Sequence, residues 1–349
     1  MKLEKYDKPL EEFDFNQITK IRTPTESYTR HYPEIVALAN KQLEEQLWFS
    51  SEMVVELDRM QLLYELTEDQ LHAVKTVLQL FLRYELIVGE EFWNGLIIQT
   101  FPRPEVKLAA SILGMTELAI HAEFYNQINV QLGLDKDEDY IAYINDTELK
   151  GRIDWLQDVL SGEDKVLACT IFGLTETALL FSSFAILKSF QSNGYNLIPV
   201  IARGANQSAV DEDLHGMVAA EIINTYYAEL GTTLKEDTVR ASVVYEAVQY
   251  AFEHECRIIN MAIPSGKLNG QTAEDYMDYV KVRLNLFCTR IGLDEPFPGV
   301  VSKIADWFEQ NTYAYKVIDF FSAGMGQEYE SSWNEQAFIA GWKEGKEGA

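Results

Sequence analysis

The chain has few cysteines and few basic residues, and these shortages exclude several classes of protein. Its 349 residues include three cysteines, Cys169, Cys256 and Cys288, which are far apart and form no C-x-x-C motif. An odd number of scattered cysteines argues against a disulfide framework and favours a reducing cytoplasm. Lys and Arg together number 29 against 55 Asp and Glu, which gives a net charge of −26. This acidic balance argues against nucleic acid and anionic membrane as partners.

Long apolar runs are also absent from the sequence. No stretch of about eighteen or more uninterrupted apolar residues occurs, so no membrane span is expected. The opening segment, MKLEKYDKPLEEFDFNQ, has no apolar core of the kind found in signal peptides. Strand patterns are limited to short apolar runs. What is present is a globular composition, 47% hydrophobic and 24% charged, in a chain long enough for one long helical domain or two domains.

Helical patterns dominate from Pro33 onward, so the predicted fold class is all-α. Thr67, followed by acidic residues, is a typical N-cap for the long amphipathic segment 66–93. Residues 163–192 are apolar on nearly all sides, which is typical of a buried helix. We expect residues 1–30 to form an extended arm, 31–325 a helical domain and 326–349 a mobile polar tail. Further helices are predicted at 33–49, 105–132, 147–161, 206–230, 236–262, 272–291 and 300–310.

Two Glu/His clusters are the most informative feature of the sequence. The first is ELAIH, residues 117–121, and the second is DEDLH, residues 211–215. Helical positions three or four apart share a face, so each cluster can point a carboxylate and an imidazole at one spot. A lone glutamate precedes each cluster, Glu85 before the first and Glu176 before the second. Glu176 lies inside the apolar helix, where a carboxylate is costly unless it is paired or binds metal.

Four carboxylates and two histidines converging in a helical bundle are the ligand set of a di-iron or di-manganese carboxylate protein. Carboxylate and imidazole ligands suit both metals. The four negative charges offset those of two divalent cations. Without metal, their mutual repulsion should raise the pKa of at least one carboxyl group.

The order of these residues resembles that of the small (β) subunit of class I ribonucleotide reductase, over about residues 30–330. That family contributes its ligands in the order carboxylate, Glu-x-x-His, Glu, Glu-x-x-His. The resemblance implies a ferritin-like helical bundle with two metal ions, iron before manganese. It also implies a homodimer that works with a separate large (α) subunit. The implied ligands are Glu85, Glu117, His121, Glu176, Glu212 and His215.

The same resemblance implies a radical tyrosine and a relay. The family's radical tyrosine lies four residues after the first ligand histidine, where this chain has Tyr125. Trp48 and Asp211 match the family's relay residues, which with His121 would carry the radical toward a cysteine of the large subunit, where ribonucleotides are reduced. Tyr329, in the tail, matches the outer relay tyrosine. Tyr313 and Tyr315 are its competitors.

Two positions depart from the family pattern. Glu85 stands where the family usually has Asp, which could alter metal choice or geometry. The first cluster reads Glu-x-x-x-His, so counting back three from His121 reaches Leu118, which cannot bind metal. A π-bulge would absorb the additional residue and leave Glu117 as the ligand, and such bulges are frequent at functional sites. With Leu118 in the ligand position, one ligand would be missing.

Three other functions remain open at this point. A different ferritin-like di-metal oxidase or hydroxylase would share the ligands but lack the relay from Trp48 to Asp211. A reductase subunit with a manganese–iron or di-manganese pair would have the same ligand types. A non-catalytic helical bundle would leave the glutamates of apolar helices unexplained.

His254, among acidic residues, has no partners at ligand spacing and is interpreted as a structural or surface residue.

Overall fold

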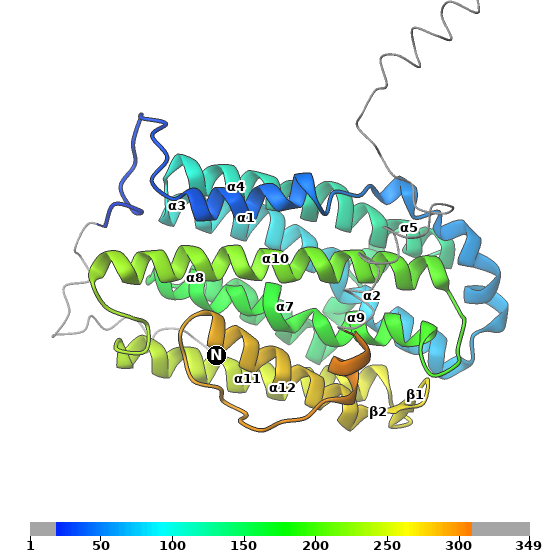
Figure 1. Cartoon of the computed structure of the whole chain (residues 1–349). Helices are drawn as coiled ribbons and strands as arrows, with labels where there is room; N and C mark the ends of the chain where they lie inside the picture. The colour runs from blue at the N-terminus through cyan, green and yellow to red at the C-terminus, as the bar shows by residue number, and fades with distance from the viewer. Residues whose placement is uncertain (1–18, 309–349) are drawn as a thin grey trace, which may run out of the picture. The chain divides into compact units, whose positions relative to one another are not determined.

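The computed structural model describes residues 19–308, and within this range the chain is almost entirely helical (Figure 1). The all-α prediction is confirmed. One antiparallel pair of two-residue strands, β1 (Lys267–Leu268) and β2 (Gln271–Thr272), joins Lys267 to Thr272 and Leu268 to Gln271. The α-helices are α1 (Pro33–Glu44), α2 (Glu68–Leu86), α3 (Ile98–Thr100), α4 (Pro104–Thr116), α5 (Ala122–Leu132), α6 (Asp137–Tyr140), α7 (Thr147–Ser161), α8 (Lys165–Leu174), α9 (Phe181–Lys188), α10 (Pro199–Leu230), α11 (Thr238–Ala262) and α12 (Ala273–Arg290).

Several of these helices are joined by turns of other helical types. Residues 303–308 are also helical. The π-helical segments are η4 (Gln61–Glu65), η5 (Ile87–Ile97), η6 (Glu117–His121) and η8 (Thr175–Leu179). Short 3₁₀ turns cover Ser50–Glu52, Val55–Asp58, Ala142–Asn145 and Ser189–Gln191. Because η5, η6 and η8 continue α2, α4 and α8 without a break, the predicted helices 66–93, 105–132 and 163–192 are each one helical run of mixed type.

Local capping fixes the start of α2, and the predicted N-cap is confirmed. The Thr67 hydroxyl accepts a hydrogen bond from the Gln70 backbone N–H, and the Gln70 side chain accepts one from the Thr67 N–H. This reciprocal capping box satisfies two backbone donors that the first helical turn leaves without partners.

The start of α10 was predicted about seven residues too late. Instead of residue 206, the helix begins at Pro199, a residue suited to the first helical position because its φ is already helical. A carboxylate from far along the chain supports this end: Asp58 Oδ2 accepts a hydrogen bond from the backbone N–H of Ile201 at 2.8 Å. Only the packing of the 3₁₀ turn Val55–Asp58 against α10 supplies this cap.

The first helix was predicted too long, and Trp48 is not on it. α1 ends at Glu44, and residues 47–49 have no regular structure. Trp48 is nevertheless buried, with 3% of its surface exposed, because the chain leaves the helix and the indole turns inward. This change of direction brings the indole N–H to a buried acceptor, the Asp211 carboxylate.

The segment from α8 to α9 lies at the centre of the helical packing. Of the described residues, only the run Lys165–Gln191 is long and apolar enough to cross a membrane, and its apolar window is wholly buried inside the fold. It packs against α10, α12, α11 and α2. The prediction of a buried core helix is therefore confirmed, since protein rather than lipid covers all of its faces. α10 lies beside α8 (Figure 1).

The described part of the predicted N-terminal arm is tied to the helices. Residues 19–32 contain no helix or strand. Ile21 is fully buried, and its backbone N–H donates to Glu229 Oε2 at 2.8 Å. Tyr32, at the start of α1, donates its hydroxyl to the other oxygen of Glu229. These contacts hold residues 19–32 against the C-terminal part of α10.

Candidate metal centre

The six predicted ligands lie on four helical segments and are all fully buried. Glu85 is near the C-terminal end of α2, and Glu176 is in η8. The first cluster forms η6, and the second lies in the middle of α10. Three of these four segments contain or adjoin a π-helical turn. Burying four carboxylates in one place is costly, so their convergence indicates a site that requires cations.

The expected π-bulge in the first cluster is confirmed, and it covers the residues for which it was predicted. η6 consists of Glu117–His121. Glu117 and His121, four residues apart, both face the site. The Leu118 side chain packs against Gly89, where a Cβ atom would lie 2.6 Å from Leu118 Cγ. In the widened turn, the Glu117 carboxylate thus faces the site and Leu118 packs away from it. The lack of a side chain at Gly89 leaves space for Leu118.

Potential ligand atoms form two groups that share two carboxylates. One group consists of Glu85, Glu117, His121 and Glu212, and the other of Glu117, Glu176, Glu212 and His215. The ligand atoms within each group lie within 4.8 Å of one another. Glu117 and Glu212 belong to both groups, so each can bridge two ions. Glu85 with His121 would complete the ligand set of one ion. Glu176 with His215 would complete that of the other.

Both histidines turn the same ring nitrogen toward the carboxylates. His121 Nδ1 lies 3.0 Å from Glu117 Oε2 and 3.2 Å from Glu212 Oε1. His215 Nδ1 lies 2.5 Å from Glu117 Oε1 and 3.4 Å from Glu212 Oε2. Both Nε2 atoms point away from the centre. Nδ1 is therefore the nitrogen of each imidazole that can bind metal.

The carboxylate oxygens that face the centre support a metal site. Apart from the two imidazole Nδ1 atoms, the described residues offer no hydrogen-bond donor to either oxygen of Glu85, to either oxygen of Glu212, or to one oxygen each of Glu117 and Glu176. Buried acceptors without donors are rare in proteins, because each carries the full cost of desolvation. Hard oxygen and imidazole ligands around a dry centre fit iron or manganese.

The charges gathered in the cluster shift the pKa values of its members. Burial, followed by repulsion from neighbouring carboxylates, raises the pKa of Glu176 well above its usual value, and burial and Glu117 do the same for Glu85. The expected rise in a carboxyl pKa is thus confirmed. Burial opposes charge on the imidazoles, but Glu117 outweighs it and raises the pKa of His121 and of His215. These same imidazoles hold the pKa of Glu117 low despite its burial.

A hydrogen-bonded layer around Asp211 orients the histidines. Asp211 Oδ2 accepts from the indole of Trp48 at 2.7 Å and contacts His121 Nε2 at 3.0 Å. Asp211 Oδ1 accepts from the Gln42 side chain at 2.9 Å, and the Gln42 oxygen lies 3.2 Å from His215 Nε2. An imidazole that donates from Nε2 keeps the lone pair of Nδ1 for metal, so one aspartate sets both tautomers. The structure thus brings together Trp48, Asp211 and His121, as the sequence predicted.

Gln42 was missed by the sequence reasoning. It lies on α1 and is fully buried, and it connects Asp211 with the second histidine. Buried glutamine is uncommon, and Gln42 lies on the same face of α1 as Ala39, Val36 and Ile35. That break in an apolar stripe was the available signal.

Tyr125 lies one turn beyond His121 on α5 and is fully buried. Its ring stacks on Phe81, with centroids 4.2 Å apart and an angle of 2° between the planes. Its hydroxyl makes no close hydrogen bond among the described residues, although the Ser208 side chain lies near enough to act on its pKa. Burial, with a further contribution from the Glu85 carboxylate, raises the pKa of Tyr125 well above its usual value. The phenol therefore stays protonated beside the cluster.

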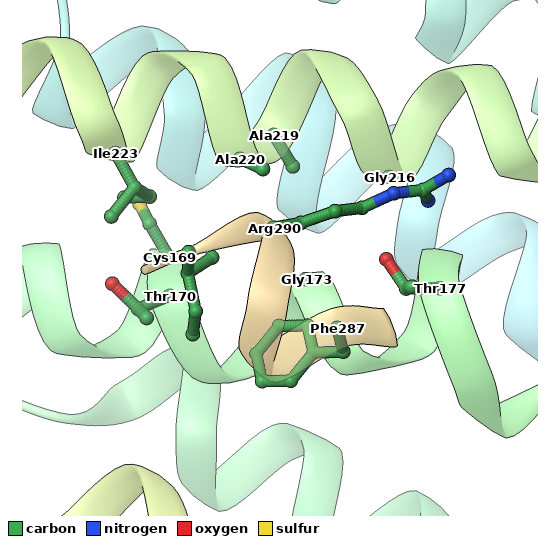
Figure 2. Close-up of a pocket in the computed structure, with 11 residues that line it drawn as sticks. Cys169, Thr170, Gly173, Thr177, Gly216, Ala219, Ala220, Ile223, Phe287 and Arg290 are labelled. Carbon is green, nitrogen blue, oxygen red and sulfur yellow. The ribbon is translucent and has the colours of Figure 1, made fainter. Parts of the chain in front are cut away.

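A small pocket adjoins the cluster on the side of Glu176 and His215 (Figure 2). Thr177 and Gly216 line it, and they directly follow the ligands Glu176 and His215. Arg290, from α12, extends across it toward Thr177 in the figure. Cys169 also lines the pocket, and burial raises the pKa of its thiol to about 12. Tyr329, the predicted outer relay residue, lies outside the described residues, as do Tyr313 and Tyr315.

A family model described as "Ribonucleotide reductase, small chain" matches residues 26–303. The protein belongs to this family. It is 25% identical over 329 residues to the B form of the ribonucleoside-diphosphate reductase small chain of Arabidopsis thaliana, covering 89% of this sequence and 91% of that one. It is 24% identical over 288 residues to the ribonucleoside-diphosphate reductase subunit beta of Chlamydia pneumoniae, covering 74% and 79% respectively.

Two solved structures share the fold. One is a class I ribonucleotide reductase from Bacillus halodurans described as putative, with a TM-score of 0.69 and 19% identity over 79% of this chain and 99% of that chain. Another is the dimanganese(II)-NrdF of Streptococcus sanguinis, with a TM-score of 0.68 and 16% identity over 82% and 99%. The predicted ferritin-like fold and the predicted function, an oxidoreductase as the small subunit of a ribonucleoside-diphosphate reductase, are thus confirmed.

Proposed function

We propose that the six buried ligands hold two metal ions and that Tyr125 stores the radical that this reductase subunit provides. The observation that carries the proposal is the convergence of six buried ligands beside a buried phenol. Six carboxylate oxygens that have no donor near them other than the two imidazoles, among the described residues, face the centre, and the Tyr125 hydroxyl lies near enough for Glu85 to affect its pKa. When reduced metal ions are bound, they supply the electrons for activating oxygen and leave an oxidising equivalent for the tyrosine.

The surroundings of Tyr125 suit a stored radical. The phenol must lose one electron and one proton together, because burial and Glu85 oppose the phenolate. Glu85 is the carboxylate with the largest effect on the phenol and is the proposed acceptor of its proton. Stacked Phe81, with tilted Phe124 at 5.0 Å, covers the ring and excludes water. A dry apolar surrounding keeps reductants away from the radical.

The proposed path out of the site begins at the ligand histidine. His121 Nε2 and the Trp48 indole meet at the same oxygen of Asp211, so a proton and an electron can move between the metal side and the tryptophan through hydrogen bonds. His121 and Trp48 also stack, with ring centroids 5.9 Å apart. Trp48, Asp211 and His121 form the inner relay in this proposal, and Tyr329 forms its outer step.

We favour iron as the metal, with manganese–iron and di-manganese pairs as the second possibility. Both ligand types, carboxylate and imidazole, suit both metals, and Glu85 supplies an oxygen just as Asp would. One relative of the same fold is described as a dimanganese(II) protein, which supports keeping manganese in the test. The separate oxidase or hydroxylase function is disfavoured by the Trp48–Asp211 contact, which such a protein would not need.

Electron paramagnetic resonance tests the proposal. The full chain is loaded anaerobically with ferrous iron and exposed to oxygen. We expect a tyrosyl doublet that Tyr125→Phe abolishes while two irons per chain remain bound. A radical that persists in Tyr125→Phe would contradict the assignment of Tyr125. Iron uptake without any radical would direct the same experiment to manganese, and failure to bind either metal would contradict the site itself.

The proposed partners are a second copy of the chain and a large subunit that reduces ribonucleotides, in the cytoplasm. The tail from residue 326, including Tyr329, is the proposed docking segment. Truncation after residue 325 should abolish reductase activity with the large subunit and leave metal content unchanged. The control is Tyr329→Phe, which should keep binding to the large subunit and lose turnover. Loss of metal on truncation would contradict this division of roles.

A further inference from the structure

Trp93 donates a hydrogen bond to the ligand Glu176. Neither the sequence pattern nor the proposed radical chemistry gives Trp93 a role. Its indole N–H donates to Glu176 Oε1 at 2.6 Å, and both residues are fully buried. The indole is held on other sides as well. Phe92 lies against it at a centroid distance of 4.9 Å, and the His215 ring meets it edge to face at 6.3 Å.

This bond divides the two oxygens of Glu176 between different tasks. Oε1 is occupied by the indole, while Oε2 has no hydrogen-bond partner among the described residues and lies 3.7 Å from His215 Nδ1. Oε2 is thus the oxygen on the metal side. A strong buried hydrogen bond to a carboxylate fixes its orientation and reduces the charge that the bonded oxygen can offer to a cation.

Glu85, the corresponding ligand of the other position, has no such restraint. Neither of its oxygens has a hydrogen-bond donor in residues 19–308. Its nearest charged contact is His121 Nδ1, 3.7 Å from Oε2. Glu85 can therefore bind through one oxygen or both. Trp93 lies eight residues after Glu85 on the same run, α2 to η5, so one helical run supplies a ligand to one position and restrains the ligand of the other.

We infer that Trp93 is a positioning residue that fixes Glu176 as a one-oxygen ligand and so makes the two metal positions unequal. This inference rests on the proposed function, since it requires that the cluster binds two ions. The metal position that Glu176 and His215 form is preorganised by the Trp93 indole. The position of Glu85 and His121 keeps a carboxylate that is able to change its mode of binding.

The test is a Mn²⁺ titration of the full chain, followed by electron paramagnetic resonance and by measurement of bound metal. Trp93→Phe removes the N–H and keeps an aromatic ring. We expect it to weaken one of the two Mn²⁺ sites by about 10- to 100-fold, as loss of a hydrogen bond to a ligand does elsewhere, and to leave the other unchanged. In a Glu176→Ala background, Trp93→Phe should have no further effect, because the acceptor of the N–H has gone.

Two controls separate this role from simple packing. Replacing Trp93 by 3-benzothienylalanine, in which sulfur replaces the N–H, should reproduce Trp93→Phe although the shape is kept. Phe92→Leu disturbs the same packing without touching Glu176 and should leave both sites unchanged. Equal weakening of the two sites, or wild-type binding by the benzothienyl variant, would overturn the inference while leaving the di-metal proposal intact. An unaltered chain that binds no Mn²⁺ or iron would instead contradict the proposed function.

Discussion

The indole nitrogen of Trp48 lies 2.7 Å from Oδ2 of Asp211, although the two residues are 163 positions apart in the chain. Asp211 directly precedes the ligand Glu212 on α10, while Trp48 lies in the irregular segment after α1. Their contact joins the proposed relay residue Trp48 to the helix that carries Glu212 and His215. The same aspartate also orients His121 directly and His215 through Gln42.

Asp211→Asn should weaken metal binding and disturb the relay together. The amide keeps the size of the aspartate but places a donor where the carboxylate accepts from Trp48, His121 and Gln42. We expect a loss of about 10- to 100-fold in metal affinity, the usual effect of removing an outer hydrogen-bond partner of a ligand. The measurement is a titration with Fe²⁺ or Mn²⁺. Unchanged affinity would mean that the histidine tautomers do not depend on Asp211.

Metal loading should release protons. Without metal, burial and neighbouring carboxylates raise the pKa of Glu85 and of Glu176, and Glu117 raises the pKa of His121 and of His215, so all four groups hold protons more tightly than they would in water. Divalent ions that bind these groups would replace such protons. Affinity should therefore increase with pH. Calorimetry in buffers with different ionisation enthalpies counts the protons, and a count near zero would contradict this charge balance.

His254 should make stability fall on acidification. Its Nδ1 accepts from Arg152 Nε at 3.1 Å, and burial, followed by the charge of Arg152, lowers the pKa of His254 to about 3. Between that value and the ordinary pKa near 6.5, the unfolded state binds a proton that the folded state does not, so stability is lost as pH falls. From pH 6.5 to pH 5 the loss is about 2 kcal/mol.

His254→Gln provides the comparison for this pH effect. The glutamine oxygen can still accept from Arg152 but does not titrate. The free energy of unfolding, measured in urea at pH 6.5 and at pH 5, should fall less in the variant by about 2 kcal/mol. The same pH dependence in both proteins would mean that His254 is charged in the folded state.

Gly216→Ala should destabilise the metal side of α10. A Cβ at this position would lie 2.3 Å from the Thr177 hydroxyl and 3.2 Å from Arg290 Nη1, and Thr177 directly follows the ligand Glu176. We expect about 1–3 kcal/mol lower stability, since overpacking forces neighbours apart, together with weaker metal binding. Thermal unfolding and metal content measure the two effects.

Gly151→Ala is the matched control for Gly216→Ala. Gly151 also lies within a helix, and its Cβ would meet only His254 Nε2, at an ordinary 3.8 Å. Because alanine is the better helix former, this variant should be as stable as the parent or more stable, with full metal content. A loss in both variants would show that the effect at Gly216 is not specific to Thr177.

Much of the ligand set could be predicted from the sequence, because the signals are local. Glu212 and His215 are three residues apart on a helix, so their shared direction follows from helical geometry. Glu176 is conspicuous because it interrupts an apolar helix. The count of four between Glu117 and His121, where the family pattern has three, even predicted the π-helical turn of η6, which absorbs the additional residue.

The sequence by itself determined the all-α class, most helices and the chemical types of the ligands, because helical periodicity and capping act over a few neighbouring residues. Tertiary structure alone decided where α1 ends and α10 begins, and it brought Gln42 to Asp211 and Trp93 to Glu176. These features depend on hydrogen bonds between buried groups far apart in the chain. No local pattern encodes such contacts, since the partner of each donor is fixed only when the helices pack.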